Sequence, residues 1–196
     1  MFSSRAKFRL ALSDGSEVLA RFPTDEEYIA FRKARSSMRV YRGDKWTEKG
    51  VGIESSATKL ADAVVISGGP VEEDEAVVLA ETLTTADDIE ITKTIGNRWS
   101  ITLQVAGGLE VTHVLRTPSV GDVRKRGKQS FRVEGLKGAS LFTIDPSPDG
   151  PLWDNLVDST EGYSEGSPVP LCHKEAAISA VIRETEKFRQ VTISPE

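Results

Sequence analysis

The chain has little of several residue types that would identify its class at once. It holds one cysteine, Cys172, two histidines and only 7% aromatic residues in 196 positions. One cysteine excludes an intramolecular disulfide, and with two histidines it cannot supply the four ligands of a Cys/His zinc site. No apolar run approaches the roughly 20 residues of a membrane-spanning helix, and the first residues lack the apolar stretch of a signal peptide. We therefore expect no membrane association, no metal and no cofactor.

What is present is an ordinary globular composition with its charges in blocks. Hydrophobic residues make up 38% and charged residues 28%, with a net charge of -5. That balance supports a folded core and excludes a wholly disordered chain. Residues 62–90 contain nine acids and no base, whereas residues 116–137 contain seven bases. Blocks of opposite sign can orient docking or self-association.

Three charged segments are the candidate partner-binding sites. They are a basic loop with Arg39, Arg42, Lys45 and Trp46, an acidic turn with Glu72, Glu73, Asp74 and Glu75, and a basic cluster with Arg124, Lys125, Arg126 and Lys128. A tryptophan in an exposed loop suits an interface anchor. The alternative interpretation of each segment is a solvated face. The net acidic charge and the few aromatics near the basic cluster argue against nucleic acid as the partner.

The start of the chain predicts a hairpin followed by a helix. Residues 8–12 and 17–22 have extended character around Asp14 and Gly15, a pair suited to a primed turn. Thr24 with Glu27 three residues later forms a capping box, which predicts a helix to about residue 35. Residues 36–55 are basic and contain glycine, and we predict a loop there.

The same pattern recurs later in the chain. Residues 101–105 alternate as residues 8–12 do, at an offset of 93 residues, and Gly107–Gly108 stands in the place of Asp14–Gly15. The tripeptide Thr117-Pro118-Ser119 then corresponds to Phe22-Pro23-Thr24, and a predicted helix follows in both places. A hairpin cannot bury its apolar face alone, so each helix is expected to fold back over its hairpin. The alternative is a chance similarity between amphipathic hairpins.

The remaining segments predict further helices and one strand. Helices are expected at residues 57–66, 72–83, 152–157 and 173–188, a short helical turn at 85–91 and a strand at 139–144. The last helix is the clearest amphipathic segment. We predict an α+β fold with two related β-hairpin-plus-helix units, added helices and a C-terminal amphipathic helix. Its segments are 1–55 (first unit and basic loop), 56–95 (acidic helical insert), 96–138 (second unit) and 139–196 (strand, helix and C-terminal helix).

A thiol and an imidazole are the one combination that suggests catalysis. A thiolate beside a histidine is a reactive pair. Cys172 and His173 are neighbours on a predicted helix, where successive side chains point about 100° apart, so adjacency does not bring them together. His113 on a predicted strand could approach Cys172, but no orienting Asn or Asp is discernible. We predict no catalytic residue; a small cytoplasmic enzyme using Cys172 and His113, or a nucleic-acid-binding regulator, are the alternative functions.

One short motif carries a resemblance. Residues 114–123 read Val-Leu-Arg-Thr-Pro-Ser-Val-Gly-Asp-Val. This segment resembles the Leu-Arg-x-Pro-Thr-x-Gly-Asp-Leu signature of small bacteriophage tail assembly proteins, and residues 21–27 are similar in plan. The resemblance implies a non-enzymatic protein of a phage or phage-like particle, acting as an assembly chaperone or a virion structural component. The implied partners are other structural or assembly proteins and further copies of the chain. The implied location is the host cytoplasm during assembly, or the particle itself.

Overall fold

A computed structural model describes residues 1–13, 15–35, 38–42, 45–49, 53–129, 131–136, 139–144 and 149–191. Side chains are described for residues 1–13, 15–34, 55–126 and 149–187. Within these residues the protein is α+β, as the sequence predicts. Its contacts divide it into two compact units. One comprises Arg5–Thr84 and Gly127–Pro148, and the other comprises Met1–Ser4, Thr85–Arg126 and Asp149–Glu196.

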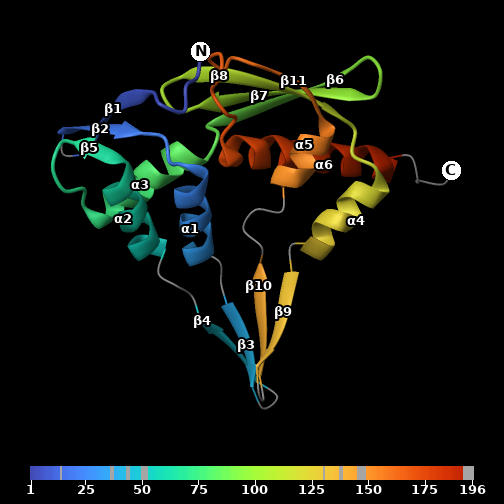
Figure 1. The fold of residues 1–196 in the computed structure, drawn as a ribbon, viewed down its shortest axis with the longest axis horizontal. Helices are drawn as coiled ribbons and strands as arrows, with labels where there is room; N and C mark the ends of the chain where they lie inside the picture. Colours follow the sequence, from blue (N-terminus) through green and yellow to red (C-terminus); the bar gives the residue numbers. More distant parts are fainter. Residues whose placement is uncertain are drawn as a thin grey trace. The chain divides into compact units, whose positions relative to one another are not determined.

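The order of helices and strands is nearly the same in the two halves of the chain (Figure 1). The first half contains β1 (Lys7–Ala11), β2 (Glu17–Arg21), α1 (Asp25–Arg35), β3 (Met38–Arg42), β4 (Lys45–Lys49), α2 (Ile53–Val64), β5 (Val65–Ser67) and α3 (Glu73–Thr84). The second half contains β6 (Asp88–Thr94), β7 (Arg98–Val105), β8 (Leu109–Arg116), α4 (Val120–Gln129), β9 (Phe131–Leu136), β10 (Ala139–Ile144), α5 (Gly150–Leu156), β11 (Val157–Glu161) and α6 (Leu171–Val191). Apart from β6, each element of the second half has a counterpart in the first. We call residues 7–84 the first repeat and residues 98–191 the second repeat.

The sheets follow the same correspondence. The strand order β1-β2-β5 of the first repeat matches the order β7-β8-β11 of the second, where β6 is added beside β7. All neighbouring strands are antiparallel. The two remaining hairpins share one sheet of order β4-β3-β10-β9, in which β3 pairs with β10.

Two glycines occupy the same place in the two repeats. Gly68 follows β5 with a φ of 126°, and Gly162 follows β11 with a φ of 86°. A Cβ on Gly68 would lie 2.6 Å from the carbonyl oxygen of Glu17, and a Cβ on Gly162 would lie 2.5 Å from that of Glu110. Both distances are too short for a side-chain carbon, so each repeat needs glycine where this loop passes the start of β2 or β8.

The last helix of each repeat also shares a buried detail. The hydroxyl of Thr84 in α3 donates to the carbonyl of Ala80 at 2.6 Å, and that of Thr185 in α6 donates to Val181 at 2.7 Å. Both threonines are buried, and the backbone bond satisfies a hydroxyl that water cannot reach. The correspondence therefore reaches beyond the predicted hairpin-plus-helix units to the end of each repeat.

The predicted helix starts after both hairpins are confirmed in detail. Thr24 N–H donates to Glu27 Oε2 at 2.8 Å, and Glu27 N–H donates to Thr24 Oγ1 at 3.3 Å. Ser119 N–H donates to Asp122 Oδ2 at 2.9 Å, and Asp122 N–H donates to Ser119 Oγ at 3.2 Å. Each pair is a capping box, which satisfies backbone donors that lack an intrahelical partner.

Two local predictions are wrong. Residues 36–55 are predicted as a loop, but Met38–Arg42 and Lys45–Lys49 form the β3–β4 hairpin and α2 begins at Ile53. Residues 85–91 are predicted as a helical turn, but Asp88–Thr94 form β6, which pairs with β7. In both cases the strand gains its hydrogen bonds from another strand, and this pairing overrides the local helix or loop signal.

The last helix is longer than predicted and belongs to a core. In α6 the residues Ala177, Ile178, Val181 and Ile182 are buried, and the helix contacts α5, β6 and β7. The apolar face that the sequence predicts for this helix is therefore turned to a core. Across the described part of the chain, no helix has the length and apolar character required to cross a membrane.

Candidate functional site

The predicted acidic turn lies at the start of α3. Glu72, Glu73 and Asp74 are exposed, as a contact surface requires. Glu75 differs, because it is half-buried and its Oε1 accepts a hydrogen bond from Ser13 N–H at 2.7 Å. Glu75 therefore ties the β1–β2 turn to α3, and three acids remain turned to solvent.

The predicted basic cluster is divided in the same way. Arg124 and Lys125 are exposed on α4. Arg126 instead donates from Nη2 to Asp149 Oδ2 at 2.8 Å, and the Asp149 side chain is 3% exposed. A buried carboxylate depends on such a charged partner, so Arg126 connects α4 to the start of α5. It is not a free contact residue.

The remaining predicted contact residues have no described side chain. Arg39 and Arg42 belong to β3, Lys45 and Trp46 to β4, and Lys128 to α4. Their side chains lie outside the described residues, so their contact role stays a prediction. Among the residues that are described, no three His, Cys, Asp or Glu side chains are grouped so as to hold a metal ion.

In each repeat an arginine at the end of the hairpin forms hydrogen bonds to a nearby helix, and we call this arrangement the arginine corner. Arg21 at the end of β2 donates to both carboxylate oxygens of Glu27 at 2.8 and 2.7 Å and to the carbonyl of Ala63 at 2.8 Å. Arg116 at the end of β8 donates to the carbonyl of Asn155. Ala63 and Asn155 each precede the last residue of α2 or α5, where helix carbonyls lack intrahelical partners. The sequence Arg-x-Pro-Thr/Ser-x-x-Glu/Asp thus joins a hairpin to two helices in both repeats.

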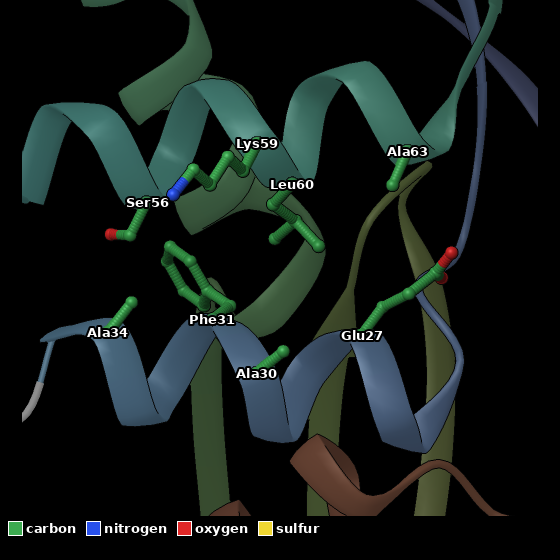
Figure 2. Close-up of a pocket in the computed structure, with 8 residues that line it drawn as sticks. All are labelled: Glu27, Ala30, Phe31, Ala34, Ser56, Lys59, Leu60 and Ala63. Atoms are coloured by element: carbon green, nitrogen blue, oxygen red, sulfur yellow. The ribbon is translucent and has the colours of Figure 1, made fainter.

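In the first repeat this corner closes one end of a groove between α1 and α2. The hydrogen bond from Arg21 lowers the pKa of Glu27 to about 2, and a bond from Thr24 N–H adds to the effect. Figure 2 shows Glu27 and Ala63 at this end, Ala34 and Ser56 at the other, and Phe31 and Leu60 between the helices. The groove has a volume of about 210 Å³ and is lined by Glu27, Ala30, Phe31, Ala34, Ser56, Lys59, Leu60 and Ala63.

The groove is apolar with one cation at its margin. Ala30 and Ala63 are exposed, so an approaching side chain can reach the groove from solvent. The Glu27 carboxylate is held by Arg21, whereas Lys59 is exposed and forms no ion pair with any residue of the described chain. The arrangement suits an apolar side chain in the groove with a carboxylate near Lys59.

A second cluster of polar groups is buried in the second repeat. His113 on β8 is 0% exposed and accepts a hydrogen bond at Nδ1 from Trp153 Nε1 at 3.2 Å. Neutral His113 then carries its proton on Nε2 and donates to the Tyr163 hydroxyl at 2.9 Å. Tyr163 in turn donates to His173 Nδ1 at 3.0 Å. The order of donors fixes both histidine tautomers.

Burial keeps this cluster uncharged at neutral pH. Desolvation lowers the pKa of His113 to about 4, with help from the charge of Lys174. Desolvation also lowers the pKa of His173 to about 3, and burial raises the pKa of Tyr163. Both ring nitrogens of His113 are already engaged, so a pair with the buried Cys172 would require one of these bonds to break. The cluster has the properties of a structural network.

The sequence contained part of the signal for these sites. Ala30 and Ala34 are four residues apart, a spacing that predicts one helix face, and Leu60 and Ala63 share a face in the same way. His113 alternates with the buried residues Val111 and Leu115, which marks an inward position on a strand. Tyr163 follows the end of β11, and nothing in the neighbouring sequence indicates its hydrogen bonds to two histidines.

Comparisons with known proteins add no family to this description. No protein-family model matches the chain, and no curated protein or solved structure is significantly similar to it.

Proposed function

We propose that this chain is a non-enzymatic protein of a phage or phage-like particle, which acts by binding other proteins during assembly or in the finished particle. The observation that carries the proposal is the apolar groove between α1 and α2, which is open to solvent and has Lys59 at its margin, a cation without an ion pair to any side chain that the structure describes. Such a combination suits recognition of a protein side chain.

Two further features support the proposal. The exposed acids Glu72, Glu73 and Asp74 and the exposed bases Arg124 and Lys125 offer surfaces of opposite sign for a partner or a second copy. The Arg-x-Pro-Thr/Ser corner that resembles phage tail assembly proteins occurs in both repeats. The phage context rests on that resemblance, whereas the contact role rests on the groove.

The test is capture of the tagged protein from its native host, followed by mass spectrometry of the captured proteins and of particles from the same lysate. Recovery of tail or head proteins is expected, and presence in purified particles would make the role structural. The Ala30→Arg variant fills the groove with a charged side chain and should lose the partner. Val78→Arg is the matched control, because Val78 is exposed on α3 and does not line the groove. A monomeric chain with no particle protein would refute the proposal.

The charged surfaces need a separate variant. Reversing Arg126 as well would break its ion pair with Asp149, so the informative change is Arg124→Glu with Lys125→Glu. If charge complementarity drives association, this double variant should associate more weakly, most of all at low salt, with an unchanged circular dichroism spectrum. Unchanged association would remove that mechanism and leave the groove as the contact site.

A further inference from the structure

The two repeats differ at one edge of their equivalent sheets. In the second repeat β6 lies against β7 along its full length, from Asp88 opposite Gln104 to Thr94 opposite Arg98. In the first repeat the counterpart of β7 is β1, which pairs only with β2 among the described strands. The edge that β6 covers in one repeat is therefore an outer edge in the other.

The backbone of β1 presents hydrogen-bonding groups along this edge. Leu12 N–H donates to Ser16 O, so the backbone groups of Leu12 face β2. Because these groups alternate along a strand, the N–H and C=O groups of Leu10 and Phe8 also face β2. The N–H and C=O groups of Lys7, Arg9 and Ala11 consequently point away from β2. In the second repeat the corresponding carbonyl of Gln104 points to the β6 side, where it accepts from Asp87 N–H at 2.8 Å.

The apolar face of β1 is also less covered than that of β7. Ile101 and Leu103 of β7 are 0% exposed, and β6 places Ile91 and Ile89 directly opposite them. Their counterparts Phe8 and Leu10 in β1 are half-buried. A strand added to β1 would remove more of this apolar surface from water.

The charges along β1 define what such a strand would carry. Lys7 and Arg9 are exposed, and among the described side chains Arg9 forms an exposed ion pair with Glu17 at 3.4 Å. In the register of β6 on β7, Glu90 lies opposite Thr102, the counterpart of Arg9. A β6-like strand on β1 would place its acid opposite Arg9 and its apolar residues opposite Phe8 and Leu10.

We propose that the outer edge of β1 binds an extended segment of a partner protein, with alternating apolar and acidic residues, added antiparallel in the register that β6 takes on β7. Main-chain hydrogen bonds would supply affinity, and the charge and apolar pairs would supply specificity. This proposal rests on the proposed function to the extent that both require a protein partner, but it concerns a different surface from the groove.

The direct test uses a synthetic peptide with the sequence of residues 87–94 and the isotopically labelled full chain. Binding should protect the amides of Lys7, Arg9 and Ala11 from hydrogen exchange and leave those of Ser100, Thr102 and Gln104 unchanged. A peptide methylated at alternate backbone nitrogens should not bind, because it cannot complete the ladder. Absence of protection on β1 would overturn the proposal, and Lys7 and Arg9 would then serve only to keep the edge from pairing. Changes on β7 instead would also overturn it, since they would show exchange with β6.

A charge swap tests the specificity. The variant Arg9→Glu should bind the acidic peptide about tenfold more weakly, because two carboxylates then face each other across the pair. A peptide in which lysines replace the acids should bind that variant and not the original chain. Equal binding of both peptides to both proteins would overturn the specificity. Loss of peptide binding with retained capture of particle proteins would refute strand addition alone, whereas peptide binding without particle capture would refute the proposed function alone.

Discussion

The two repeats differ in the contact between equivalent helices, which is apolar between α1 and α2 and ionic between α4 and α5. Seven residues after the capping residue, α1 carries Phe31, which lines the apolar groove against α2. At the same position α4 carries Arg126, which pairs with the buried carboxylate of Asp149 at the start of α5. One backbone plan therefore accepts either an apolar or an ionic junction, and the apolar junction leaves a surface that a partner can enter.

The sheets show the same contrast. Ala20 of β2 lies opposite Phe8, and His113 of β8 lies opposite Ile101, the counterpart of Phe8. Both Ala20 and His113 are fully buried, but only the histidine brings a polar network with it. In the second repeat, buried polar side chains make specific contacts with one another. The first has more accessible apolar surface at the groove and at Phe8 and Leu10, as its proposed contact role requires.

The largest effect is expected at the ionic junction. Arg126→Ala leaves the Asp149 carboxylate buried without its partner and should lower the free energy of unfolding by about 3 kcal/mol. Adding Asp149→Ala to Arg126→Phe removes both charges and should recover most of the loss. Urea denaturation measures both variants, and Arg124→Ala on the exposed face of α4 is the control, expected within about 0.5 kcal/mol of the unmodified chain. Equal effects of Arg126→Ala and Arg124→Ala would contradict the difference between the junctions.

The next effect is a loss of stability in acid that comes from the second repeat. The folded pKa of His113 is about 4, below its unfolded value of 6.5, so the unfolded chain binds more protons between these values. The contribution of His113 to the free energy of unfolding is therefore complete above pH 6.5 and is lost as the pH falls toward 4. The loss is on the order of 3 kcal/mol for this group. His113→Ala, which copies the residue of the first repeat, should be less stable at pH 7 but less sensitive to acid. If the free energy of unfolding of this variant depends on pH as steeply as that of the unmodified chain, His113 is not the source of the acid sensitivity.

The two close glycines test the equivalence of the repeats. Gly68→Ala and Gly162→Ala each force a side-chain carbon onto a carbonyl oxygen at positive φ, and each should cost about 2 kcal/mol or more. Gly15→Ala has a positive φ but open space around the added carbon, so about 1 kcal/mol is expected. Thermal unfolding of the three variants gives the comparison. A large effect at only one of the two close positions would show that the repeats use this contact differently.

The smallest effects are expected at the capping boxes. Thr24→Ala and Ser119→Ala each remove the side-chain acceptor of the first helical turn and should cost about 1 kcal/mol. Thr24→Ser should retain most of the stability, since its hydroxyl can make the same bond. Chemical denaturation is sufficient to rank these variants. Costs that differ by several kcal/mol between Thr24→Ala and Ser119→Ala would contradict the equivalence of the two helix starts.

Local signals predicted the parts of the fold that local interactions determine. The alternation around Asp14–Gly15 and the capping residues Thr24 and Ser119 gave both hairpin-plus-helix units, and the strand at 139–144 has the predicted bounds. Each of these depends on contacts within about ten residues of sequence, in tight turns and first helical turns.

The parts of the fold and of the candidate site that the sequence does not predict depend on contacts between distant segments. The strand β6 completes its ladder only on β7, and β3 pairs with β10, about a hundred positions away in the sequence. The groove likewise needs two helices, and Tyr163 meets His113 from a different part of the chain. The sequence does not predict the correspondence of α3 with α6, because their exposed residues differ while the buried Thr84 and Thr185 match.

The most direct test of binding through the first repeat is hydrogen–deuterium exchange of the tagged full chain, alone and in the complex recovered from its native host. We predict new protection in β1 and along the α1–α2 groove at residues 30–34 and 56–63, with little change in β8 and α6. Protection confined to the second repeat, or a complex with no change in exchange anywhere in the first, would contradict it.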